Sequence, residues 1–287
     1  MSIHATHQRL HGDGVSLAAD LWAPNPGAPR GSVLLLHGGG QTRHSWQRTG
    51  IRLSEHGWIS VAVDARGHGD SDWAQDGDYS SAAHARDVLR MASELEGPIV
   101  LVGASMGGMA ALTAQSMSPV LAEALILVDI TPVAEPKGLE KITAFMTSGL
   151  SGFDSLQDAA DAVAKYNPHR RRAPHPEGLR KNLRHRDGRW YWHWDPRLLS
   201  HRDHSPDRAS VRERHARAAA KTITVPTLLI RGAQSDVVSK EGVADLLATI
   251  PTARHIDVSG AGHMVSGDDN DVLSEGLVAF LDEVVRP

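Results

Sequence analysis

The sequence of 287 residues contains no cysteine. This absence excludes disulfide bonds, thiol catalysis and cysteine-ligated metals, but it does not identify the cellular compartment. Aromatic residues are also scarce, whereas hydrophobic residues make up 41% of the chain. A chain of this length and composition is long enough for one large α/β domain, or for a core that carries an inserted subdomain.

Long apolar runs are missing as well. None approaches the ~20 residues of a membrane-spanning helix, and the first seven residues lack the apolar core of a signal peptide. We therefore expect a cytoplasmic protein with no membrane partner. A net charge of −4 argues against a nucleic-acid partner. The expected partner is a small-molecule ester substrate, bound by a monomer or a homodimer.

Short apolar strands alternate with amphipathic helices along most of the chain, which predicts a doubly wound, mostly parallel sheet of the α/β class. An edge strand is expected over residues 15–22. The buried strands are expected at 32–36, 59–63, 99–102, 125–128, 227–230 and 255–258, and the helices at 45–56, 81–95, 106–118, 240–249 and 272–285.

This alternation breaks between residues 131 and 221, where the pattern shows no clear strand and only helical stretches such as 156–166. The break lies between two strands of one sheet. We therefore predict a core formed by residues 1–131 and 222–287, interrupted by an inserted segment over 132–221.

The central feature of the sequence is a serine at a sharp bend. An apolar strand runs into Gly103-Ala104-Ser105-Met106-Gly107, and a helix-favouring stretch follows. Small residues around Ser105 allow a tight strand–turn–helix bend that lifts the hydroxyl above the sheet, as in a nucleophile elbow. The helix that follows would direct its first N–H groups toward negative charge developing in acyl transfer.

A serine needs a base to remove its proton, and the base needs an acid to orient it. His263 lies on a glycine-rich loop after one strand, and Asp236 on the loop after the preceding strand. The chain order of serine, aspartate and histidine is that of the α/β-hydrolase triad. We predict Ser105 as nucleophile, His263 as base and Asp236 as acid. Asp129, which follows strand 125–128, is the rival acid and is interpreted as a cap of the next turn.

The oxyanion of an acyl-transfer intermediate needs two N–H donors. Met106, directly after the nucleophile, is predicted to supply one. Gly39 or Gly40, on the loop after strand 32–36, would supply the other. We favour Gly39 and assign Gly40 to the substrate-binding surface.

Five motifs together resemble the α/β-hydrolase superfamily. They are HGGGQTRHSW, DARGHGDSD, GASMGG, GAQSD and GAGH. The resemblance is to its serine-nucleophile branch, which includes esterases, non-haem haloperoxidase-like enzymes, enol-lactonases and carbon–carbon bond hydrolases. It implies an eight-stranded sheet with a helical cap inserted after strand six. Hormone-sensitive-lipase-type esterases usually carry an acidic residue before the elbow serine. This chain has Ala104 there, so we do not assign it to that group.

The predicted cap is basic. Residues 165–221 contain 16 Lys and Arg but six Asp and Glu. A basic lid would attract an anionic substrate, and the first residues to test are Arg170, Arg171 and Arg172. An alternative is that these arginines pair with the body or face solvent.

Three of the seven tryptophans lie between residues 190 and 194 of the predicted cap. We predict that Trp192 and Trp194 line an apolar substrate pocket with Phe145 and Met146, although packing of the cap on the core is the alternative. The histidines in this region, His201, His204 and His215, are not predicted to bind a metal, because the usual ligand motifs are missing.

The sequence thus predicts a cofactor-independent serine hydrolase that cleaves a small to medium carboxylic ester, including a half-ester or lactone, through an acyl-enzyme. Within enzymes, the alternatives are a carbon–carbon bond hydrolase or a perhydrolase with the same triad. From a different class, the alternative is a non-catalytic ligand receptor with the hydrolase fold.

Overall fold

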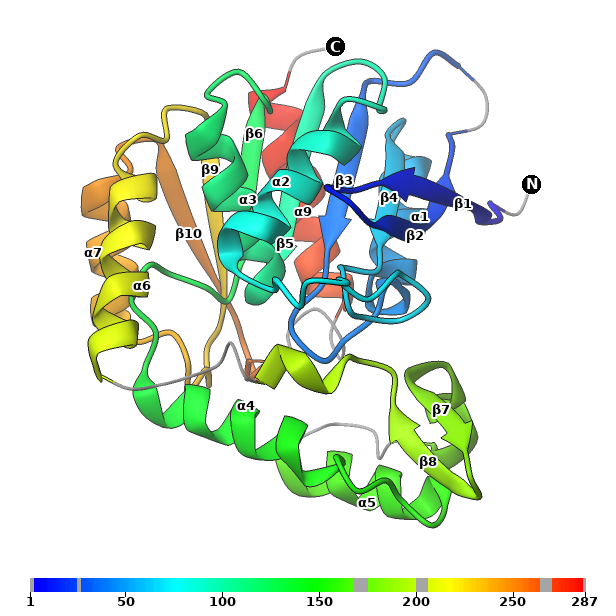
Figure 1. Cartoon of the computed structure of the whole chain (residues 1–287). Helices are drawn as coiled ribbons and strands as arrows, with labels where there is room; N and C mark the ends of the chain where they lie inside the picture. Colours follow the sequence, from blue (N-terminus) through cyan, green and yellow to red (C-terminus); the bar gives the residue numbers. More distant parts are fainter. Residues whose placement is uncertain (1–2, 25–26, 168–174, 200–205, 264–269, 286–287) are drawn as a thin grey trace.

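The computed structural model describes residues 3–24, 27–167, 175–199, 206–263 and 270–285 (Figure 1). Its centre is an eight-stranded sheet in the order β1-β2-β4-β3-β5-β6-β9-β10. The strands are β1 (Thr6–His11), β2 (Ser16–Trp22), β3 (Ser32–Leu36), β4 (Ile59–Val63), β5 (Ile99–Ala104), β6 (Ala124–Val128), β9 (Thr227–Gly232) and β10 (Ala253–Val258). β2 pairs antiparallel with β1 and β4, and the other neighbours are parallel. The predicted fold class is confirmed.

Helices cover both faces of the sheet. One face packs against α1 (Gln47–Glu55) and α9 (Asn270–Val284), and the other against α2 (Ser81–Ala92), α3 (Met106–Met117), α6 (Pro206–Ala220) and α7 (Lys240–Thr249). Successive residues of β5 alternate between the two cores, with Leu101 in one and Val102 in the other. Burial on both faces explains why the strands appear in the sequence as continuous apolar runs.

The chain between β6 and β9 forms the insertion. After α4 (Pro136–Ser148) and α5 (Leu156–Tyr166) come the 3-10 helix η2 (Pro176–Asn182), β7 (Leu183–Arg186), β8 (Arg189–Trp192) and η3 (Pro196–Leu199). Figure 1 shows α4, α5, β7 and β8 gathered beyond the carboxyl ends of the central strands. In contrast, α6 packs on α3 and α7 in the helix layer of the core. The boundaries 132 and 221 stay a prediction.

The insertion also contains a hairpin that the sequence analysis missed. β7 and β8 pair antiparallel, joined by Asp187 and Gly188, which both have positive φ, 49° and 78°. Two such residues form the tight turn that an Asp-Gly pair favours, and this pair was the signal available in the sequence. β1 and α4 were also not predicted. No helix in the described part of the chain is long and apolar enough to span a membrane.

Candidate active site

Ser105 sits at the bend between β5 and α3. Its backbone has φ 47° and ψ −112°, a strained conformation for a residue with a side chain. The bend is possible because glycines lie where no side chain would fit. A Cβ on Gly103 would come within 2.4 Å of the Gly107 carbonyl oxygen, and one on Gly107 within 2.4 Å of the Leu36 oxygen. The predicted strand–turn–helix context of Ser105 is therefore present.

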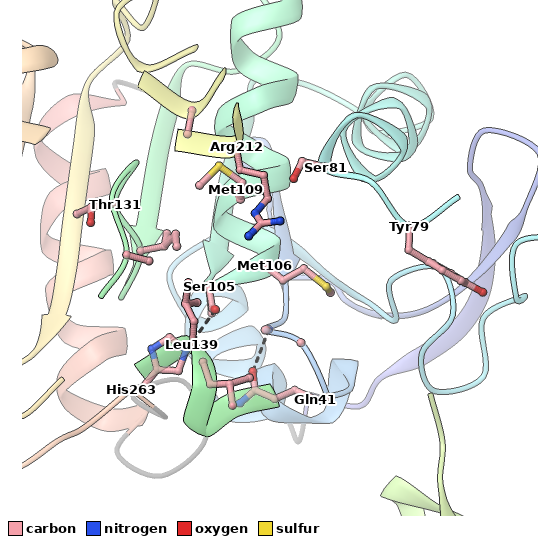
Figure 2. Close-up of a pocket in the computed structure, with 18 of the residues that line it drawn as sticks. Gln41, Tyr79, Ser81, Ser105, Met106, Met109, Thr131, Leu139, Arg212 and His263 are labelled. Carbon is pink, nitrogen blue, oxygen red and sulfur yellow. Dashed lines mark hydrogen bonds between the residues drawn. The ribbon is translucent and has the colours of Figure 1, made fainter. Parts of the chain in front are cut away.

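A chain of hydrogen bonds starts at this serine. The Oγ of Ser105 lies 3.2 Å from Nε2 of His263 (Figure 2), and Nδ1 of His263 lies 2.6 Å from Oδ2 of Asp129. Because a carboxylate can only accept, Nδ1 carries the proton and Nε2 is left to accept the hydrogen of the serine. This is the tautomer that a general base next to a serine requires.

The carboxylate that contacts His263 is that of Asp129, not that of Asp236 as the sequence predicted. Asp129 directly follows β6, is 1% exposed, and also accepts hydrogen bonds from the Gly232 N–H (3.0 Å) and the Ser235 hydroxyl (2.6 Å). Asp236 instead forms an ion pair with Lys141 of α4 at 2.7 Å, and its side chain is 41% exposed. The acid loop does take part in the arrangement, but through Ser235, one residue before the predicted aspartate.

The loop after β3 lies beside Ser105. Gly38 donates its N–H to Oε1 of Gln41 (2.9 Å; Figure 2), and Gly40 donates its N–H to Nε2 of His68 (3.2 Å). The N–H groups of these two glycines thus have acceptors within the protein. Gly39 lines the cavity together with Gly38, Gly40, Ser105 and Met106. Met106 is the first residue of α3, where a helix has no internal partner for the N–H. Of the predicted donors, Met106 directly follows the nucleophile, and Gly39 lines the same cavity.

Ser105, Met106 and His263 open into a cavity of about 1950 Å³ between the core and the insertion. Its walls are largely apolar and include Met109, Ile130, Val133, Leu139 and Ile142. Polar and charged side chains line it as well, among them Ser105 and His263. Such a cavity is the usual form of a small-molecule site.

A comparison with protein families matches residues 31–269 to the alpha/beta hydrolase fold. This match spans the elbow, the histidine loop and the insertion. The chain belongs to the α/β-hydrolase family.

Two curated relatives of this α/β hydrolase are similar over most of their length. It is 33% identical to Esterase Rv0045c of Mycobacterium tuberculosis, over 89% of this chain and 83% of the relative. It is 27% identical to the 2-(acetamidomethylene)succinate hydrolase of Mesorhizobium japonicum, over 87% of each chain. A crystal structure of E-2-(acetamidomethylene)succinate hydrolase shares the fold with a TM-score of 0.82 and 23% identity, covering 97% of this chain and all of the other.

The predicted substrate-binding residues of this α/β hydrolase divide into two groups. Gly40, Phe145 and Trp192 line the cavity. Trp194 and Met146 do not. They are 3% and 0% exposed and belong to the core under the cap. Trp194 stacks on Trp192 with ring centroids 5.0 Å apart, so its role is to support the wall of the cavity from behind.

Some predictions fall outside the described residues. Arg170, Arg171 and Arg172 lie there, as do His201 and His204. The expected absence of a metal site therefore stays a prediction.

Three buried histidines support the loop after β3. His37 and His68 have ring centroids 5.1 Å apart, and His68 and His193 5.7 Å. Burial lowers the pKa of His37, lowers that of His68 well below its usual range, and lowers the pKa of His193 to about 3. Each uses a ring nitrogen to accept a backbone N–H, from Ala65, Gly40 and Gly69 respectively. All three are therefore neutral in the folded α/β hydrolase.

These histidines predict that acid destabilises the protein. In the unfolded chain the pKa of each histidine returns to about 6.5. Below that pH, and above the lower pKa of the folded state, the unfolded chain binds more protons than the folded protein. Stability is thus present above pH ~6.5 and is lost as the pH falls. His193→Asn keeps an acceptor for Gly69 but cannot titrate. We expect it to reduce the loss in unfolding free energy between pH ~7.5 and ~5 by about 1–2 kcal/mol, measured by urea denaturation at both pH values.

The matched control is His4→Asn, because His4 is an exposed histidine. It should leave the pH dependence unchanged. An equal pH dependence in wild type and His193→Asn would contradict the assignment of a depressed pKa to His193.

Proposed function

We propose that this chain is a cofactor-independent serine hydrolase that cleaves a carboxylic ester of small to medium size through an acyl-enzyme. The observation that carries the proposal is the hydrogen-bond chain Ser105–His263–Asp129 at the floor of the cavity. The similarity to a named esterase over most of the chain supports the same reaction class.

The reaction would proceed in two halves. His263 takes the proton of Ser105 as the hydroxyl attacks the ester carbonyl, and Asp129 stabilises the resulting imidazolium. The N–H groups of Met106 and Gly39 receive the oxyanion. His263 then gives its proton to the leaving alcohol. In the second half a water molecule, activated by His263, attacks the acyl-enzyme and releases the carboxylic acid and Ser105.

The side chains that line the cavity indicate which acyl groups it could accept. Apolar side chains from α4 and β8, Leu139, Phe145 and Trp192, line the cavity. They would take up an aliphatic or aromatic acyl chain by apolar burial, which contributes about 25 cal/mol per Å². The cavity is large enough that shape alone does not restrict the enzyme to acetyl esters.

The test is turnover of a panel containing p-nitrophenyl acetate and butyrate, alkyl esters, lactones and vinylogous diketones, with product mass as the readout and Ser105→Ala as the blank. Serine-dependent release of carboxylic acid from esters is the expected result. Cleavage of the diketones without ester turnover would replace the proposal by carbon–carbon bond hydrolysis. No turnover of any substrate would favour a ligand receptor. Action in the cytoplasm as a monomer or homodimer stays a prediction.

A further inference from the structure

Arg212 of α6 is a charged residue at the cavity that the proposed triad does not use. α6 packs against α3, the helix that begins directly after Ser105. Arg212 lines the cavity together with Ser105, Met106 and Met109. Figure 2 shows its guanidinium directed from α6 into the cavity, on the side of Met106 and Ser105.

Five other arginines of the described insertion are not among the residues that line the cavity. Within the described residues they form ion pairs with nearby carboxylates: Arg180 with Glu177 (2.5 Å), Arg184 with Asp70 (2.6 Å), Arg189 with Asp154 (2.7 Å), Arg197 with Asp195 (2.7 Å) and Arg217 with Asp245 (2.5 Å). Many of the excess positive charges of the insertion are therefore paired with carboxylates of the protein. The Lys and Arg side chains of the described insertion that line the cavity are Lys181 and Arg212.

The charged side chains that line the cavity are of both signs. Glu135, Glu140 and Glu213 also line it, and Glu213 accepts a hydrogen bond from Arg217. With both signs present, long-range attraction would not select an anion. Selection requires a directional contact, and a guanidinium provides one because its planar fork matches the two oxygens of a carboxylate.

We propose that Arg212 determines specificity by binding a carboxylate of the substrate, so that the preferred esters are half-esters of dicarboxylic acids. This inference rests on the proposed function, since it places the ester carbonyl at Ser105 and the free carboxylate at α6. The apolar floor around Met106 and Met109 would contact the methylene chain between the two groups. Arg212 is exposed, so salt screens its charge in part. The preference for the monoester should therefore be smaller at high ionic strength, but it should remain because the contact is directional.

The experiment compares the monoethyl and diethyl esters of adipic acid at low and high salt. In the wild type, kcat/KM should favour the monoester at both. In Arg212→Gln, the ratio of kcat/KM for monoester over diester should fall about 10- to 100-fold, the range expected for hydrogen bonds to a charged group. Arg212→Lys should give an intermediate ratio because it keeps the charge but loses the fork.

Arg214→Gln is the matched control. Arg214 is an exposed arginine two residues further along α6 and is not among the cavity-lining residues, so its replacement should leave the ratio unchanged. An unchanged ratio in Arg212→Gln, or a fall seen with Lys181→Gln instead, would overturn the assignment to Arg212. Turnover of the diester with no monoester preference would overturn this inference alone. If neither ester is cleaved in a Ser105-dependent way, the proposed function fails as well.

Discussion

Replacing Ser105 with alanine is expected to lower kcat for ester hydrolysis by about 10⁴–10⁶-fold, because residues of such a triad act as a unit. The change deletes one oxygen that faces the cavity. The strained backbone at this bend, with φ 47°, is held by the close approach of Gly103 and Gly107, which the substitution leaves in place. Steady-state kinetics with p-nitrophenyl butyrate measure the effect.

Thermal unfolding is the control for Ser105→Ala. The variant should unfold at or above the wild-type temperature, since alanine removes no packing contact of the core. Activity within about tenfold of the wild type would mean that Ser105 is not the nucleophile, because the loss of any triad member costs far more.

Asp129→Asn is expected to lower kcat by roughly 10⁴-fold. In the native protein Oδ1 of Asp129 accepts a hydrogen bond from the Gly232 N–H. Oδ2 accepts hydrogen bonds from both His263 and the Ser235 hydroxyl. An asparagine would keep its oxygen toward the Gly232 N–H, which must donate. Its amide group would then face His263 and force Nδ1 to accept, so that the proton moves to Nε2. A ring in that tautomer cannot take the proton of Ser105.

Asp236→Asn provides the matched comparison. Asp236 follows a strand, as Asp129 does, but its side chain is exposed and pairs with Lys141. An exposed ion pair contributes about 0–1 kcal/mol to stability, so the variant should keep kcat within about threefold of the wild type. The reverse ranking of the two variants would return the role of acid to Asp236. Both are measured with the same ester at the same pH.

The difference between these two aspartates shows what the sequence could and could not predict. Both follow apolar strands that end at the same edge of the sheet. Position along the chain therefore does not decide which of them orients His263. What separates them is the register of β6 against β9, where Val128 pairs with Ile230. That pairing brings Asp129 next to Gly232 and Ser235. Asp236 instead pairs with Lys141 of α4 and does not contact His263. These are tertiary contacts that no local pattern encodes.

Elsewhere in the sequence the local signals were strong. The bounds of β3, β4, α5 and α7 match the predicted ranges, because apolar runs and helix caps such as Ser155 and Ser239 mark their ends. The tryptophan-rich segment was harder to interpret. No strand was predicted there, whereas Arg189–Trp192 form β8. Whether Trp192 or Trp194 reaches the cavity depends on how the hairpin packs on α4.

The most direct test of the central claim is the site of covalent modification by a fluorophosphonate ester, read by intact mass and peptide mapping. We expect a single adduct on Ser105, formed quickly in the wild type, slowly in Asp129→Asn and not at all in Ser105→Ala. Excess ester substrate should protect the serine. An adduct on another residue, or none under conditions where esters are hydrolysed, would contradict the assignment of Ser105 as the nucleophile of this α/β hydrolase.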